Sequence, residues 1–502
     1  MGRDSMQGRT QREIKLNIII GVSNQILILL INLVSKNVIL NSLNLDYLGL
    51  QTVFGNFCDL FSFAFSGIGF AVLFSLYRPF EDHDQQRIRI IYRYYDSLYR
   101  IISFIVLGVG LISTVIVLFS VNADISNTEI ILTYLTYLIS IIAYNRYLMQ
   151  HYFVIANQKR YIICLINGLV DTAALAVEIA VLQLTRNYEL FLLCLLFKNI
   201  VINGIVLLYL RKIHPYLFEK EEVPEPKDKK SILGNIKDLI LYRIGTVMLN
   251  STDSIIVSLL ISTAMSGCYA NYLFISNGVL SLVESFYASI VAKIGRLITT
   301  HSKQDQFQDF WNVSMVGLWI NGFTVTCFFF LVQDFILLWM GSETQLTSVI
   351  VGLIALNLYL AGMRQTTGTY RQSAGIFHKV GEIVVLRGIL NLVLSFLLGW
   401  FWGLFGILIA TTISNLATLY WYEPYLMFRY FGKSFRYEFL YQGLGLLSTA
   451  FCLLFTGLAI SFLSGSGWLF FLLKAFICFI ISNGCYLAMF LLYQRIRNNF
   501  IN

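Results

Sequence analysis

The stretch LCLLFKNIVINGIVLLYL, from Leu193 to Leu210, has a single charged residue, Lys198, among leucine, isoleucine and valine. About 20 apolar residues are needed for a helix to cross the hydrocarbon core of a bilayer. Such stretches recur along the whole chain of 502 residues, which is 57% hydrophobic and 13% charged. Lipid offers the backbone no hydrogen-bond partners, and the stretches are too long for barrel strands. The sequence therefore predicts an all-α polytopic membrane protein.

The apolar stretches, read against their charged flanks, predict fourteen membrane-spanning helices. The first is followed by no small-residue cleavage site, so we expect a retained helix and not a signal peptide. The predicted spans are 16–40, 47–77, 94–120, 128–152, 161–184, 189–210, 238–261, 269–295, 311–334, 346–372, 380–401, 404–428, 439–462 and 467–493.

Lysine and arginine are concentrated in alternate loops, among them 3–15, 78–93, 211–237 and 429–436, whereas the loops between hold only Arg186. By the positive-inside rule, both termini are expected in the cytoplasm, which requires an even number of spans. The formal net charge of +8 then reflects topology and contact with lipid headgroups, so no nucleic-acid partner is needed to explain it.

The cysteines and histidines do not form a pattern typical of a metal or disulfide framework. No CxxC pair occurs, and the five histidines are scattered. We interpret the cysteines as packing residues and expect no metal and no resident cofactor. The cysteines are Cys58, Cys164, Cys194, Cys268, Cys327, Cys452, Cys478 and Cys485.

A hydrophilic run, EKEEVPEPKDKK from Glu219 to Lys230, separates six predicted spans from eight. An offset of 218 positions places Arg146 on Arg364 and pairs span four with span ten, as expected for duplicated bundles. We predict two pseudo-symmetric six-helix bundles with two helices appended. The predicted domains are 1–218 for the first bundle, 219–237 for a cytoplasmic linker, 238–436 for the second bundle and 437–502 for the two added spans.

Polar residues recur within the predicted spans at steps of three, four and seven, which places each set on one helical face. Such stripes would suit helices around a hydrated cavity, although Ser, Thr and Asn more often bond a neighbouring helix. The stripes are Asn17, Asn24, Asn32 and Ser35; Asn56, Asp59, Ser62 and Ser66; Asn167, Asp171 and Glu178; Arg243, Thr246, Asn250 and Asp253; Asn277, Ser281 and Glu284; and Asn357, Arg364, Thr367 and Arg371.

The charged members of these stripes are the candidate site residues. An ionisable group at the centre of a membrane helix costs at least about 2.5–3.5 kcal/mol, so it is kept where it meets a partner or water. Lys198 lies about 13 Å of helix beyond Glu189, too deep for comfortable snorkelling, whereas Lys474 could snorkel outward. Arg146 and Arg387 lie nearer the cytoplasmic side.

Cations in this setting could hold a phosphate-like anion through charge-assisted hydrogen bonds. The acids could neutralise those cations or bind H⁺ or Na⁺ and couple transport to an ion gradient. The sequence leaves open which acid pairs with which base. Candidate substrate-binding residues are Lys36, Arg146, Lys198, Arg243, Arg364 and Arg387; candidate ion-coupling or ion-pairing residues are Asp59, Asp171, Glu178, Asp253 and Glu284.

Two long stretches carry a resemblance to a known family. The run YLGLQTVFGNFCDLFSFAFSGIGFAVLFSLYRPFEDHD from Tyr47 to Asp84, and NSTDSIIVSLLISTAMSGCYANYLFI from Asn250 to Ile275, resemble the polysaccharide-transport branch of the multidrug/oligosaccharidyl-lipid/polysaccharide (MOP) exporter superfamily. That branch includes Wzx-type flippases. The resemblance covers nearly the whole chain and includes the arrangement of spans as six, six and two.

The resemblance implies alternating access between inward-open and outward-open states in a bacterial cytoplasmic membrane. The implied substrate is an undecaprenyl-pyrophosphate-linked oligosaccharide, moved from the inner to the outer leaflet for capsule, exopolysaccharide or O-antigen biosynthesis. Lys198 and the other intramembrane cations would then meet the pyrophosphate and acidic sugars. We expect a monomer in contact with membrane lipid and with a polysaccharide polymerase and glycosyltransferases as possible partners.

Three alternatives remain open from the sequence. A multidrug/cation antiporter of the same superfamily usually has a proline in its first helix, which the first span here lacks. A flippase for the peptidoglycan precursor is compatible with the composition. A membrane-embedded polymerase or glycosyltransferase would be an enzyme, but the short predicted outer loops, such as NSLNLD at 41–46, leave no room for a catalytic domain. We therefore expect no enzymatic activity.

Overall fold

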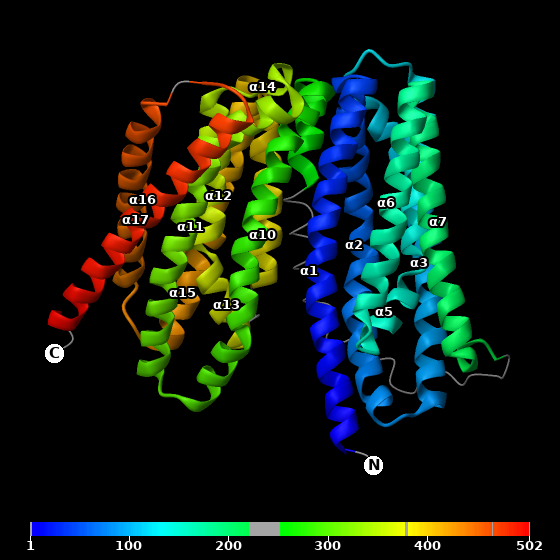
Figure 1. Cartoon of the computed structure of the whole chain (residues 1–502), viewed down its shortest axis with the longest axis horizontal. Helices are drawn as coiled ribbons and strands as arrows, with labels where there is room; N and C mark the ends of the chain where they lie inside the picture. The colour runs from blue at the N-terminus through cyan, green and yellow to red at the C-terminus, as the bar shows by residue number, and fades with distance from the viewer. Residues whose placement is uncertain (1–2, 220–250, 377–379, 464, 501–502) are drawn as a thin grey trace. The chain divides into compact units, whose positions relative to one another are not determined.

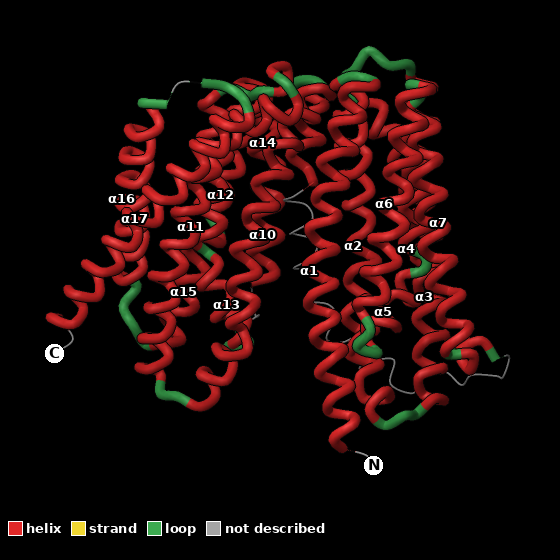
Figure 2. Tube along the Cα trace, viewed as in Figure 1, coloured by secondary structure: helices red, strands yellow, loops and turns green. Residues whose placement is uncertain are grey.

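The computed structural model describes residues 3–219, 251–376, 380–463 and 465–500. In these ranges, helices are joined by short loops and no strand occurs (Figure 2). Eleven helical segments of the described residues are long and apolar enough to cross a membrane. The chain is thus a multi-pass, all-helical membrane protein.

The chain divides into two compact units, residues 1–267 and 268–502. The predicted linker 219–237 lies outside the described residues except for Glu219, whose carboxylate pairs with Arg89 at 2.9 Å. The elements of the first unit are α1 (Arg3–Ser42), α2 (Leu45–Glu81), α3 (Gln85–Ser120), α4 (Asn127–Asn145), α5 (Leu148–Ala156), α6 (Arg160–Thr185), α7 (Tyr188–Ile213), the 3₁₀ turn η1 (Pro215–Phe218) and a helical segment at Ser251–Leu260 (Figure 1).

Several helices begin at side chains suited to capping. Asn44, Ser126 and Asn187 precede α2, α4 and α7, and each accepts a hydrogen bond from a backbone N–H in the first turn. Such caps satisfy amide groups that the helix itself leaves without partners. The capping residues therefore fix where the chain turns between successive helices.

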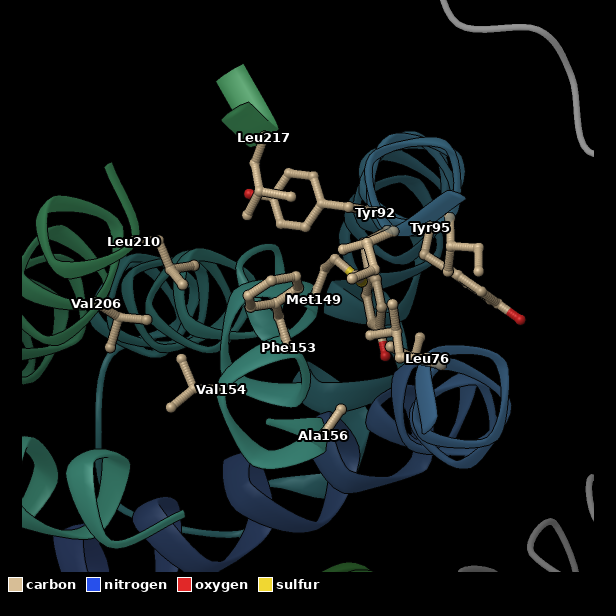
Figure 3. Close-up of a cluster of buried hydrophobic side chains, with 14 of the residues drawn as sticks. Leu76, Tyr92, Tyr95, Met149, Phe153, Val154, Ala156, Val206, Leu210 and Leu217 are labelled. Carbon is tan, nitrogen blue, oxygen red and sulfur yellow. The ribbon is translucent and has the colours of Figure 1, made fainter. Parts of the chain in front are cut away.

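An apolar core holds the short helix α5 in the first unit. Phe153 of α5 is buried with Leu76 of α2, Tyr92 of α3 and Leu210 of α7, and Leu217 of η1 joins the same cluster (Figure 3). The rings of Tyr92 and Phe153 meet edge to face, with centroids 5.8 Å apart. These contacts hold α5 against three neighbouring helices.

The predicted span 128–152 is interrupted between α4 and α5. Asn203 of α7 donates from Nδ2 to the carbonyl oxygen of Ala143 at 2.8 Å. In a regular helix that oxygen would accept from the amide of Tyr147, which here donates to the carbonyl of Tyr144. A side chain that enters the backbone ladder in this way breaks or kinks a helix. Arg146 lies at the resulting break.

The second unit contains most of α10 (Thr263–Thr300) together with the remaining helices. These are α11 (Lys303–Met340), α12 (Ser348–Met363), α13 (Gln365–Ser373), α14 (Val380–Leu416), α15 (Leu419–Phe431), α16 (Arg436–Ser461) and α17 (Trp468–Phe500), with the 3₁₀ turn η2 (Ser342–Thr344) before α12 (Figure 1).

The break between α12 and α13 has the same local cause as the break between α4 and α5. The side chain of Asn321 in α11 donates to the carbonyl oxygen of Tyr359 at 3.0 Å. The side-chain amide of Asn321 fits there because Gly362 has no Cβ atom, which would overlap it. Arg364 lies at this break, and the helix that follows has nine residues, as does α5. The 218-residue offset thus relates two arginines in the same local structure.

A reversal of the chain at Gly403 divides α14. Gly403 has φ 58° and ψ −139°, and the Asn391 side chain accepts a hydrogen bond from Ser414 across the two arms. The reversal falls between the predicted spans 380–401 and 404–428, although 380–431 is one continuous candidate span by length and composition. The number of fourteen spans stays a prediction, since the predicted span 238–261 is described only from residue 251.

Gly406 is required where the two arms of α14 approach each other. A Cβ atom at this position would lie 2.0 Å from the carbonyl oxygen of Leu398. We predict that Gly406→Ala costs at least the roughly 1–3 kcal/mol typical of overpacking and lowers the thermal unfolding temperature in detergent. Gly443→Ala is the control, because nothing lies within 4 Å of its added Cβ. Equal unfolding temperatures for the two variants would contradict the tight reversal.

Candidate functional site

A buried carboxylate in the second unit is shared by arginines from neighbouring elements. Glu423 of α15 accepts from Arg364 at 2.7 Å and lies 3.2 Å from Nε of Arg371 in α13. The side chains of Glu423 and Arg371 are 3% and 2% exposed, whereas that of Arg364 is 19% exposed. Arg387 of α14 interacts electrostatically with the same carboxylate. We refer to Glu423, Arg364, Arg371 and Arg387 as the Glu423 cluster.

The backbone places these side chains on converging faces. Arg364 and Arg371 are seven residues apart, close to two helical turns, so they project to the same side of the α12–α13 segment. Arg364 also donates to Asn415 at 3.3 Å, and Arg371 donates from Nη1 to the Ile376 carbonyl at 2.8 Å. Arg371 is therefore held in place, whereas Arg364 is partly accessible.

The composition of the Glu423 cluster favours anion binding. Two guanidinium groups contact one carboxylate, a third interacts with it electrostatically, and the cluster lies in segments long and apolar enough to span a membrane. Guanidinium groups bind carboxylate and phosphate through paired, charge-assisted hydrogen bonds. Arg364 and Arg387 are both partly exposed, so each could contact a phosphate while Arg371 keeps Glu423 in position.

In the first unit, the charges are more closely balanced. Lys198 of α7 lies 3.3 Å from Asp171 of α6, and both side chains are more than four-fifths buried. Lys198 also lines a groove of about 460 Å³ between α6 and α7, whose other walls are apolar and include Val177, Leu193 and Phe197. The intramembrane lysine is thus held by a carboxylate from the adjacent helix.

Glu178 lies on α6 two helical turns beyond Asp171 and interacts with Lys198 electrostatically. It is buried, and its Oε1 atom has no hydrogen-bond partner among the described residues. The structure therefore brings three of the predicted residues, Lys198, Asp171 and Glu178, into one group.

Arg146 forms a separate ion pair at the break after α4. Its two terminal nitrogens lie 2.9 and 3.2 Å from the oxygens of Asp96 in α3, and Gln150 of α5 also donates to Asp96. The pair is bidentate and mostly buried. Arg146 therefore ties the break to α3 through Asp96, which also lies 3.5 Å from the more exposed Arg100.

The remaining predicted residues are distributed over other positions. Lys36, Asp59 and Asp253 are each engaged in an interaction, and Asp253 is buried. Glu284 accepts from Gln365 at 3.4 Å. Arg243 lies outside the described residues. Lys474, expected to snorkel, pairs with Asp334 of α11 at 2.6 Å.

Sequence reasoning missed the acids that organise the arginines, Glu423 and Asp96. Glu423 lies inside the predicted span 404–428, so its charge within an apolar stretch was itself a signal. Asp96 follows an arginine-rich loop near the start of span three, where an acid is unremarkable in sequence. Arg371 was listed only as part of a polar stripe, because an arginine near the predicted cytoplasmic end of a span is also explained by the positive-inside rule.

Removing the carboxylate of Glu423 should be costly, because Arg371 would remain buried without its acid. We predict that Glu423→Gln destabilises the protein by about 3–5 kcal/mol, the usual cost of breaking one side of a buried ion pair. Thermal unfolding in detergent measures the loss. Glu382→Gln, at an exposed acid of α14, is the control. The same small shift in both variants would show that Glu423 does not stabilise the cluster.

The Lys198–Asp171 pair can be tested by a double-mutant cycle. Lys198→Ala and Asp171→Ala each leave a mostly buried charge without its partner, so we expect each to lower the unfolding temperature. The double variant should be more stable than the sum of the single effects indicates, since it removes both charges. Strict additivity would mean that the two side chains are not coupled.

No family model and no curated protein matches the sequence. Solved structures do match it. The lipid II flippase MurJ in an inward closed conformation has a TM-score of 0.67 and 14% identity, over 97% of this chain and 100% of that one. An inward-facing multidrug resistance MATE family transporter of the MOP superfamily has a TM-score of 0.63 and 12% identity, over 77% and 91%.

A MATE transporter from Vibrio cholerae has a TM-score of 0.55 and 13% identity, over 88% of this chain and 100% of that one. At these identities the likeness concerns the fold. The structures with which the fold is shared are flippases and transporters. The chain has the fold of the MOP transporter superfamily.

Proposed function

We propose that the protein is a polysaccharide repeat-unit flippase. It would move an undecaprenyl-pyrophosphate-linked oligosaccharide from the inner to the outer leaflet of a bacterial cytoplasmic membrane by alternating access, coupled to an ion gradient. The product would enter capsule, exopolysaccharide or O-antigen biosynthesis. The observation that carries this proposal is the Glu423 cluster, in which one acid contacts Arg364 and Arg371 and interacts electrostatically with Arg387.

The chemistry of the substrate accounts for the cluster. A pyrophosphate linker is anionic and has several acceptor oxygens, whereas the isoprenoid chain is soluble in the bilayer. The headgroup therefore needs cationic partners within the membrane, where an isolated charge is costly. Arg364 and Arg387 would supply such partners, and the buried Arg371–Glu423 pair would hold them in position.

A flippase for the peptidoglycan precursor is the second candidate. The likeness to the lipid II flippase MurJ over nearly the full length of both chains favours it. A lipid-linked precursor of that kind is also anionic, so the Glu423 cluster does not separate the two substrates. A carrier of cationic drugs is less well supported, because its cargo would meet like charge at Arg364 and Arg387.

Translocation in proteoliposomes tests the role of the arginines. A hydrogen bond to a charged group contributes about 1.5–3 kcal/mol, and about 1.4 kcal/mol corresponds to tenfold in affinity. We predict that Arg364→Gln lowers binding and translocation of an undecaprenyl-pyrophosphate-linked oligosaccharide roughly tenfold or more. Arg429→Gln, at an exposed arginine on α15, should leave both unchanged.

The same vesicles distinguish the candidate functions. The proposal requires the wild-type protein to move the oligosaccharide repeat unit faster than it moves lipid II. Preference for lipid II would favour the second candidate. Chemical conversion of the lipid-linked sugar without translocation would indicate an enzyme and contradict both.

A further inference from the structure

An acid at the start of α16 is buried without a cation. The Glu438 side chain lies in the first turn of this helix, and the residue is 2% exposed. No lysine, arginine or histidine among the described residues forms an ion pair with it, and Gln442 Nε2 donates to its Oε1 at 2.6 Å. Glu438 therefore differs from Glu423, which has guanidinium partners.

Two hydrogen bonds connect Glu438 with the helix that holds the Glu423 cluster. Gln442 donates to Glu438 and accepts from the hydroxyl of Tyr420 in α15. Tyr420 precedes Glu423 by three residues, so the two side chains share a face of α15. Tyr420 also interacts electrostatically with Arg364. The path from Glu438 to the arginines thus passes through two side chains.

Apart from Arg364 at its far end, the groups that the described part of the chain places around this path are neutral. Tyr441 lies one turn beyond Glu438 on α16, and α11 contributes the indole ring of Trp311 against Tyr441. The other titratable groups that face the path are tyrosines. They are Tyr287 of α10, Tyr359 of α12, Tyr420 of α15 and, through Thr449, Tyr486 of α17.

Burial and the helix terminus act on Glu438 in opposite directions. An ionised carboxylate that is desolvated without a partner costs several kcal/mol. The N-terminal end of a helix stabilises a negative side chain in its first turn by only about 0.3–1 kcal/mol. The neutral carboxylic acid is the form that fits this environment, and as a hydrogen-bond acceptor it still matches Gln442.

We propose that Glu438 is a proton-binding site whose occupancy is linked to anion binding at the Glu423 cluster; the linkage, but not the protonation, rests on the proposed function. In the state described here, Glu438 holds the proton as an O–H bond. Release to water leaves a carboxylate, for which Arg364 is the cation connected through Gln442 and Tyr420. The ionised acid then adds negative charge near Arg364 and weakens its attraction for a phosphate, so the bound proton favours binding of the headgroup. By linkage, each raises the affinity for the other by the same factor.

Infrared spectroscopy tests protonation without any substrate. The wild-type protein at neutral pH should show the C=O stretching band of a buried carboxylic acid. Glu438→Gln, which is isosteric and neutral, should lack that band, and Glu382→Gln should retain it. A wild-type spectrum from which Glu438→Gln removes no carboxylic-acid band would overturn the proposal, because Glu438 would then be ionised.

Binding of undecaprenyl pyrophosphate tests the linkage. Wild-type affinity should fall as the pH is raised through the ionisation of Glu438, by at most tenfold per pH unit, the limit for one proton. Glu438→Gln should remove this pH dependence. Protonation of the lipid phosphates affects binding to the wild-type protein and to the variant equally, so it does not contribute to the difference between them. Tyr420→Phe should keep the infrared band but weaken the pH dependence.

The outcomes separate the two proposals. The same pH dependence in wild type and Glu438→Gln would refute the linkage. Failure of the wild-type protein to bind the lipid at any pH would refute the proposed function, while the infrared result would still decide whether Glu438 carries a proton.

Discussion

The carboxylate of Glu423 is shared by one guanidinium group at a helix break and another in the helix that follows, and the architecture around it follows from the cost of charge in hydrocarbon. Arg371 is almost completely buried, so it requires an acid within reach. Glu423 supplies that acid from α15 and also holds Arg364 at the break between α12 and α13. One acid thus ties α15 to the α12–α13 segment and leaves Arg364 partly accessible.

The two units use the same local device with different charge balance. An asparagine from a neighbouring helix, Asn203 or Asn321, enters the backbone ladder and breaks a span beside an arginine. In the first unit, Arg146 shares Asp96 with Arg100, whose side chain is mostly exposed. In the second, the equivalent Arg364 belongs to a cluster with more cations than acids. The additional cation Arg387 and the near-complete burial of Arg371 favour the second unit for the proposed anion site. Lys198 of the first unit is paired with Asp171 of the neighbouring helix.

The sequence predicted the helical class and the position of the reversal at Gly403, because these depend on apolar length and local turn chemistry. The 218-residue offset in the sequence also aligned Arg146 with Arg364. The sequence could not predict the breaks beside them, since these arise from Asn203 and Asn321, which are distant in the chain. The partners of the arginines were likewise hidden, because ion pairing depends on how helices pack. The acid Glu438, just before an apolar stretch, is typical of a helix start, and only its burial distinguishes it.

We propose that the Glu423 cluster receives the pyrophosphate of a lipid-linked sugar. A cryo-electron microscopy structure of the protein saturated with an undecaprenyl-pyrophosphate-linked oligosaccharide would test this. We expect phosphate density within hydrogen-bonding distance of Arg364 or Arg387, with Arg371 still paired to Glu423. Phosphate density bound elsewhere, with Arg364 and Arg387 unchanged, would contradict it.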